Sequence, residues 1–111
     1  MGKVVYLCGE KYNKIQILNK IEIEQYMLKH AITQSALQAW IDKVEAVEWK
    51  NHNDLKQLFP SADYVGNARY VFNIKGNGYR IVAVVVFVMG FISIRFIGTH
   101  AEYDKIDCAT I

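Results

Sequence analysis

The chain has 111 residues, of which 52% are hydrophobic and 22% charged, and its 13 basic and 11 acidic side chains give a formal net charge of +2. A disordered chain has far fewer apolar residues, and two domains need a longer chain, so the composition indicates one globular domain. The small net charge excludes a protein that binds nucleic acid mainly through a strong overall positive field. A local basic site remains compatible with it.

Cysteine spacing and hydropathy indicate a soluble, cytoplasmic protein that does not contact a membrane. Cys8 and Cys108 lie near opposite ends of the chain, at no spacing suited to zinc, so we expect two reduced thiols. The N-terminal apolar stretch is too short for a signal peptide. The longest apolar run, 81–92, falls short of the ~18 residues that a membrane span needs, and Arg80 and Arg95 flank it.

The first elements expected are a short strand and a helix. Residues 15–18 predict the strand, and residues 4–7 could form another. Asn19 is a candidate N-cap of the helix, with Glu22 three residues later as in a capping box, and the apolar spacing continues to His30.

Two more helices are expected before the single proline. Thr33 can cap the first, and its apolar stripe has the spacing of one helix face. The stripe consists of Leu37, Trp40, Ile41, Val44 and Val47. Asn53 can cap a short helix through Phe59, which Pro60 then ends.

After the proline the hydrophobic period becomes two, which is typical of strands. Residues 69–75, 79–88 and 91–99 predict three strands, joined by turns at 76–78 and 89–90. The middle strand is apolar on both faces, so we expect it to be central and covered. The expected fold is α+β: an N-terminal strand and two helices packed on an antiparallel sheet that a C-terminal three-stranded meander completes. The other face of the sheet would be partly open.

The arginines are confined to the predicted meander. Arg69 and Asn73 share one face of its first strand, with Lys75 at the end, while Arg80 opens the second strand and Arg95 lies in the third. In an antiparallel meander these positions can converge on one end of one face, where planar guanidinium groups would bind a phosphate. Alternatively, they are scattered arginines without a common ligand.

Arg95 interrupts an apolar strand, where a charge is costly unless it is paired or faces a polar groove. Glu102 or Asp104 could pair with it structurally, and a phosphate could pair with it functionally.

His100 and Tyr103 follow the last strand, three residues apart. Histidine exchanges protons near neutral pH, and tyrosine can orient it or donate a proton. Beside arginines, this grouping suits cleavage of RNA through its 2′-hydroxyl, with Arg stabilising the charge that develops on phosphorus. No carboxylate cluster for a metal is visible, so we expect neither metal nor cofactor. The alternative is that His100 simply caps the strand end.

Several runs of the sequence together resemble the HigB-type toxins of bacterial type II toxin–antitoxin systems, within the RelE-like mRNA interferases. These runs are 37–40 (LQAW), 49–50 (WK), 58–62 (LFPSA), 66–69 (GNAR), 71–80 (VFNIKGNGYR) and 94–106 (IRFIGTHAEYDKI). The resemblance covers residues 15 to 109, and we therefore expect one RelE-like domain over 15–111.

The resemblance implies a ribosome-dependent endoribonuclease that cuts mRNA without metal and arrests translation. It implies as partners mRNA, the ribosome and a HigA-like helix-turn-helix antitoxin, with operator DNA bound only through the antitoxin complex. Carried onto this chain, the motifs supply candidate catalytic and RNA-binding residues. The catalytic candidates are His100, Arg80, Arg95, Tyr103 and Lys75, and the RNA-binding candidates are Arg69, Asn73 and Asn67.

Within that set, Arg80 and Arg95 would stabilise the negative charge of the phosphate and of the transition state. His100 would act as general acid or base, with Tyr103 assisting. Lys75 is a weaker candidate. Residues 1–14 depart from the family pattern, in which the chain starts close to the first strand. They would be an extra edge strand, the result of an alternative start, or an appended segment.

Two other functions fit the same fold. A non-catalytic RNA- or ribosome-binding module would arrest translation without cutting transcripts. A regulatory partner of the antitoxin would repress its operon without being toxic.

Overall fold

The computed structural model describes residues 15–46, 48–76 and 78–111. The extension 1–14, with its predicted strand at 4–7 and Cys8, lies outside these ranges, as do Val47 and Asn77. None of the helices in the described ranges is long and apolar enough to cross a membrane.

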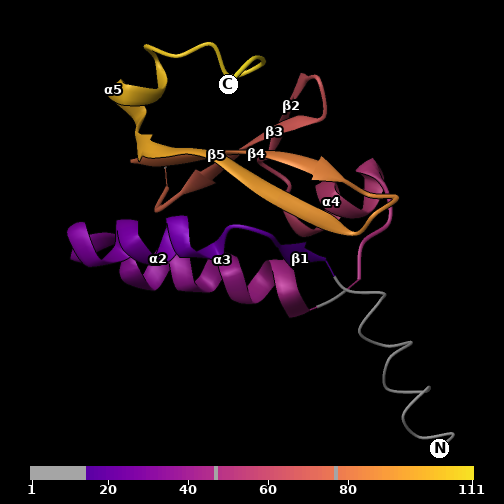
Figure 1. The fold of residues 1–111 in the computed structure, drawn as a ribbon, viewed down its shortest axis with the longest axis horizontal. Coiled ribbons are helices and arrows are strands. Elements are labelled where there is room, and N and C mark those ends of the chain that lie inside the picture. Colours follow the sequence, from indigo (N-terminus) through magenta and orange to yellow (C-terminus); the bar gives the residue numbers. More distant parts are fainter. Residues whose placement is uncertain (1–14, 47, 77) are drawn as a thin grey trace, which may run out of the picture.

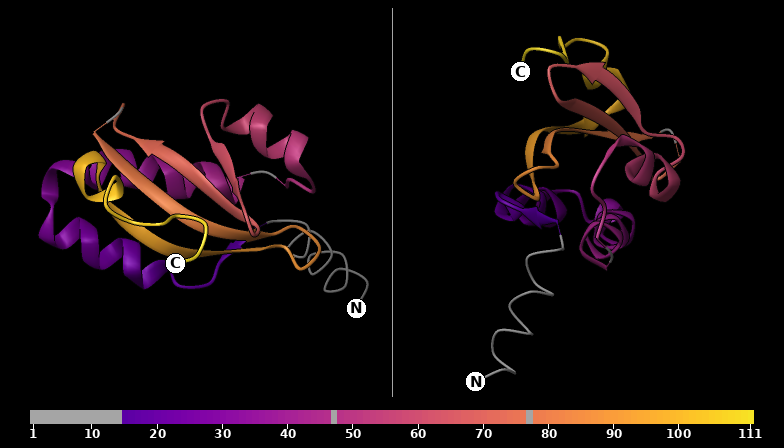
Figure 2. Two further views of the ribbon diagram at one scale, coloured as in Figure 1. Left: turned by 90° about the horizontal axis from the view of Figure 1, so that it is seen from above. Right: turned by 90° about the vertical axis from the view of Figure 1, so that its right-hand side faces the viewer.

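The chain folds into helices on one side of a mixed five-stranded sheet (Figure 1), which confirms the α+β class. The elements in chain order are β1 (Gln16–Ile17), α2 (Lys20–Lys29), the 3-10 helix η1 (Ala31–Thr33), α3 (Gln34–Ala46), α4 (His52–Leu58), β2 (Asp63–Gly66), β3 (Arg69–Ile74), β4 (Tyr79–Val86), β5 (Phe91–Thr99) and α5 (His100–Tyr103). The strand order across the sheet is β1-β5-β4-β3-β2. Helices α2 and α3 lie side by side beneath the sheet, and the segment after β5 crosses its other face (Figure 2).

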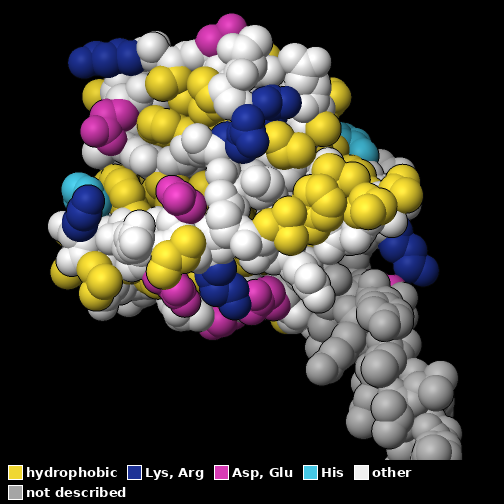
Figure 3. Space-filling model, in the orientation of Figure 1, with side chains coloured by type: hydrophobic (Ala, Val, Ile, Leu, Met, Phe, Trp, Pro, Cys, Tyr) yellow, Lys and Arg dark blue, Asp and Glu magenta, His cyan; other side chains and the backbone are white. Residues whose placement is uncertain are grey.

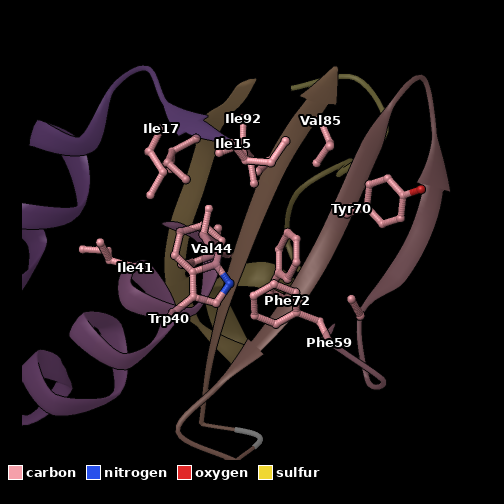
Figure 4. Close-up of a cluster of buried hydrophobic side chains, with 14 of the residues drawn as sticks. Ile15, Ile17, Trp40, Ile41, Val44, Phe59, Tyr70, Phe72, Val85 and Ile92 are labelled. Carbon is pink, nitrogen blue, oxygen red and sulfur yellow. The ribbon is translucent and has the colours of Figure 1, made fainter. Parts of the chain in front are cut away.

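The core forms between α3 and the helix-facing side of the sheet (Figure 4). Because side chains alternate along a strand, β3 directs Tyr70, Phe72 and Ile74 to the helices. The Trp40 ring meets the Phe72 ring edge to face at a centroid distance of 5.3 Å. The predicted stripe of α3 is buried as expected over its described members, which are Leu37, Trp40, Ile41 and Val44.

Two strands differ from the prediction of a wholly antiparallel sheet. β1 pairs in parallel with β5, which is far from it in the chain, because the antiparallel strands β2 to β5 end with β5 running in the direction of β1. β2 was not predicted, since its four residues are exposed or half-buried and show no alternation, and a bulge lies between Tyr64 and Gly66. It pairs antiparallel with β3 and forms one edge of the sheet.

The helix caps also differ from the prediction at two asparagines. Asn19 makes no side-chain cap on α2; its amide instead bonds both main-chain groups of Ile94 in β5, at 2.8 Å each, and so fastens the start of α2 to the sheet. Asn51, not Asn53, caps α4, because its side chain accepts from the Asp54 amide.

Candidate active site

The strand register places the candidate polar residues on the face of the sheet that α2 and α3 do not cover. Since Phe72 faces the helices, Arg69 and Asn73 of β3 face the opposite way. Arg80 of β4 lies directly across from Asn73. Figure 3 shows basic side chains in the upper part of the molecule, where acidic side chains lie too, and both kinds are present again lower down over the helices. The shared open face predicted for Arg69 and Asn73 is therefore confirmed.

Arg80 and Tyr103 meet at the end of this face where β4 begins and α5 follows β5. The Arg80 guanidinium lies over the Tyr103 ring, 5.8 Å from its centroid, and Nη1 donates to the Tyr79 carbonyl at 3.4 Å. The His100 amide donates to the Gly78 carbonyl in the β3–β4 turn, which ties α5 to the same end of the sheet. These contacts bring residues from β4 and α5 to one place.

A capping box holds the single turn of α5. The Thr99 hydroxyl accepts from the Glu102 amide at 3.1 Å, and Glu102 Oε1 accepts from the Thr99 amide at 2.8 Å. Gly98 leaves room for this arrangement, because a Cβ there would lie 2.7 Å from Glu102 Oε1 and 2.5 Å from the Phe96 ring. A helix of one turn has little stability of its own, so the cap determines where His100 and Tyr103 project.

His100 is half-exposed and accessible to a ligand. Its Nδ1 lies 3.4 Å from Asp104 Oδ1, one turn further along. An acidic neighbour beside one ring nitrogen helps to orient the imidazole. His100 and Tyr103 are three residues apart on the same turn, which brings their side chains to neighbouring positions.

Tyr103 is held in its protonated form. Burial is the main cause that raises the pKa of its hydroxyl to about 12, helped by the Cys108 thiol 3.6 Å away, while Arg80 acts in the opposite direction. At neutral pH this phenol is therefore protonated.

Arg69 and Arg95 form a separate group at another part of the face. Arg69 donates to the main-chain oxygen of Ile111 from Nε at 3.1 Å and from Nη2 at 2.6 Å, and Arg95 donates to the same oxygen from Nε at 3.1 Å. Asn67 adds a bond from its amide to the Ala109 carbonyl at 2.9 Å. The segment 107–111 thus lies across these three side chains.

A bulge in β5 explains why the Arg95 side chain is exposed although the strand around it is apolar. Val82 pairs with Phe96 and Ala83 with Ile94, so Arg95 is the extra residue and is exposed. Neither carboxylate suggested as its partner binds it in the structure: Glu102 caps α5 and Asp104 faces His100. Its side-chain bond goes to Ile111 instead.

The arginines therefore share a face but do not converge at one end, and this part of the prediction is wrong. Arg69 is four residues from Asn73 along β3, about 13 Å at ~3.3 Å per residue. The reason is the register, which sets Arg80 opposite Asn73 and Arg69 opposite Val84. Lys75 lies beyond β3 in the turn, exposed and with a φ of 52°, closer to the Arg80 end.

Sequence reasoning overlooked the capping role of Glu102 and the contacts of the C-terminal segment. The role of Glu102 could have been found, since Thr99 and Glu102 have the spacing of a capping box. The contacts of Ala109 and Ile111 leave no local signal, because main-chain oxygens accept them. Within the described ranges, no group of three or more His, Cys, Asp or Glu side chains is placed to hold a metal ion.

Comparison with known proteins gives a consistent family. Residues 33–106 match the model of the HigB toxin family, described as the RelE-like toxic component of a toxin–antitoxin system. The mRNA interferase toxin HigB of Escherichia coli K12 is 38% identical over 92 residues, which cover 68% of this chain and 88% of the relative. The mRNA interferase HigB of Escherichia coli O6:H1 (strain CFT073) is 27% identical over 94 residues, 83% of this chain and 91% of the relative.

Proposed function

The chain belongs to the HigB family of RelE-like toxins, and from this premise we propose that it is an mRNA interferase, an endoribonuclease that cuts mRNA and thereby inhibits translation. The observation that carries the proposal is the group at the α5 end of the open face. There the Arg80 guanidinium of β4 lies over the ring of Tyr103, a protonated phenol on the capped turn α5, and the same turn carries the His100 imidazole. These are the groups that cleavage through a 2′-hydroxyl requires.

In the proposed reaction the RNA 2′-oxygen attacks the adjacent phosphorus. His100 accepts the 2′-hydroxyl proton as the new O–P bond forms, with Asp104 orienting the imidazole. The bond from phosphorus to the 5′-oxygen breaks, and Tyr103 donates a proton to that leaving oxygen. The products are a 2′,3′-cyclic phosphate and a 5′-hydroxyl, and the protons balance when His100 returns its proton to Tyr103 through water.

Arg80 has the electrostatic role in this scheme. Negative charge accumulates on the phosphoryl oxygens in the transition state, and a positioned guanidinium stabilises it more than it stabilises the substrate. The Tyr103 ring beneath Arg80 orients the guanidinium plane. Asn73, opposite Arg80, and Lys75 in the adjoining turn would bind the RNA backbone near the scissile phosphate.

The proposal includes the setting in which the enzyme works. The mRNA would be cut on the ribosome, in the cytoplasm. The antitoxin would be a HigA-like helix-turn-helix protein, and operator DNA would be bound only by the complex of the two. A ribosome that presents mRNA already positioned reduces the need for a strong overall positive field, in keeping with a net charge of +2.

Induction of the chain in bacteria, with sequencing of RNA 5′ ends, tests the proposal. We expect growth arrest and new 5′ ends within coding regions, both abolished by His100→Ala. The matched control is His30→Ala, since His30 stacks on Tyr26 at the end of α2. Growth arrest without new 5′ ends would replace the enzyme with a non-catalytic RNA- or ribosome-binding module. Repression of an operon by a non-toxic wild-type chain would replace it with a regulatory partner.

A further inference from the structure

The segment 107–111 occupies the donors of two arginines that face the same way as Arg80. The bonds from Arg69 and Arg95 meet at one oxygen atom, that of Ile111. Two guanidinium groups repel each other when they are brought together, so they need an acceptor between them. The site is thus a preformed fork for an oxygen-rich group.

A phosphate is a second acceptor that suits this fork. Three N–H groups of the two guanidinium groups point at the single atom Ile111 O. A phosphate diester offers several oxygens and a negative charge, and arginine binds it through paired hydrogen bonds. The C-terminal segment and an RNA phosphate would therefore compete for the same N–H groups.

We propose that Arg69 and Arg95 form a second phosphate subsite for RNA, away from the scissile phosphate, and that residues 107–111 occupy it until RNA displaces them. This inference rests on the proposed function, because it assigns the subsite to the same RNA strand. The spacing of about 13 Å along β3 separates Arg69 from the residue opposite Arg80, so the two sites bind different phosphates.

The segment is held weakly enough to be displaced. Its own turn depends on Asp107, whose carboxylate accepts from the Ala109 amide at 3.2 Å and whose carbonyl accepts from Thr110. Besides the bonds from the arginines, the Ala109 carbonyl accepts a hydrogen bond from the side-chain amide of Asn67, which is exposed. Because residues 107–111 belong to no helix or strand, local opening of this segment costs less free energy than opening of the sheet.

The same segment connects the two ends of the face. Cys108 contacts the Tyr103 hydroxyl at 3.6 Å, three residues before Ile111 binds the arginines. Displacement of residues 107–111 by RNA therefore also exposes Tyr103. Occupation of the second subsite would in this way prepare the cleavage site for its substrate.

The test measures binding of a short single-stranded RNA with 2′-O-methyl groups, which cannot be cleaved, to the full chain. Asp107→Ala removes the acceptor that shapes the segment, and we expect it to tighten binding about two- to tenfold, the effect of one hydrogen bond. Asp107→Asn removes the charge but keeps the acceptor, so its affinity should stay close to wild type. Addition of Arg69→Ala to Asp107→Ala should cancel the gain.

Hydrogen exchange on the wild-type chain supplies a measurement that needs no substitution. We expect the amides of 109–111 to exchange faster when RNA is bound. Unchanged or slower exchange of these amides overturns the proposal. So does an RNA affinity that is the same in every variant, or too weak to measure in all of them. RNA cleavage in cells is scored separately with His100→Ala, so the failure of either proposal can be recognised independently of the other.

Discussion

The open face of the sheet carries arginines in two different surroundings. At the α5 end, Arg80 lies against the Tyr103 ring, beside a turn that Thr99 and Glu102 cap. At the other end, Arg69 and Arg95 donate to a main-chain oxygen of the C-terminal segment. One end combines an arginine with an imidazole and a phenol, the groups to which we assign proton transfer, and the other combines arginines with a main-chain acceptor.

In our proposal, this difference assigns RNA cleavage to one end of the face and RNA binding to the other. A guanidinium near a proton donor and an imidazole can stabilise a transition state. A pair of guanidinium groups with no titratable partner can only hold an anion. The number of arginines on the face is therefore a poor guide to how many take part in catalysis.

The largest expected effect distinguishes Arg80 from Arg69. Arg80→Ala should lower the single-turnover rate of mRNA cleavage on ribosomes on the order of 10²–10³-fold, the usual loss when one donor to a developing oxyanion is removed. Arg69→Ala should weaken RNA binding but leave the rate at saturating RNA close to wild type. Equal losses of rate would show that the two ends form one site.

The next effect concerns the proton donor at the α5 end. Tyr103→Phe keeps the ring beneath Arg80 and removes only the hydroxyl, so we expect a loss of cleavage rate of about 10²-fold, at the lower end for acid–base catalysis. Tyr64→Phe is the matched control, because the Tyr64 hydroxyl accepts from the Ala68 amide in the β2–β3 turn. A rate unchanged by Tyr103→Phe would assign the donation to another group.

A smaller effect tests the cap that positions the α5 end. Thr99→Ala should cost about 1 kcal/mol of stability, the usual value for an N-cap, measured as the free energy of unfolding in urea. The cleavage rate should fall as well, because His100 and Tyr103 both project from the capped turn. Ser35→Ala, at an exposed position of α3, is the control. A stability loss with full activity would show that α5 keeps its place without the cap.

Much of the fold follows from periodicities visible in the sequence. The stripe of α3 and the alternation along β3 depend only on which residues are apolar, and both are found as expected. β2 escaped prediction because an edge strand of four exposed or half-buried residues needs no apolar pattern. Asn19 was misassigned because its amide can bond a helix end or a neighbouring strand, and Ile94, which it binds, is 75 residues away.

The candidate site was predictable to the extent that its contacts are local. His100, Tyr103 and Glu102 lie within one turn, so their spacing carries the information. The grouping of Arg69 with Arg95 depends on a bulge in β5 and on an oxygen 42 residues from Arg69. Residue spacing along the chain reveals neither the bulge nor the distant oxygen. The sequence therefore predicted one cluster of arginines, whereas the structure has two groups.

The last expected effect is a pH dependence of stability to which the α5 end contributes through Tyr103. Burial raises the pKa of Tyr103 from its ordinary value of 10.0 to about 12, so the folded state binds this proton more tightly than the unfolded state does. Its contribution to stability is therefore complete below about pH 10 and is lost as the pH rises towards 12.

Urea unfolding at a series of alkaline pH values measures this contribution. Burial raises the pKa of Tyr26 and Tyr70 as well, so wild type and Tyr103→Phe should both lose stability with rising pH, and the variant should lose less. Asp107→Ala should fall between them, because a looser segment exposes Tyr103 and moves Cys108 away from its hydroxyl. Parallel pH profiles for all three proteins would show that the C-terminal segment does not cover the proton donor, and that the two ends of the face act independently.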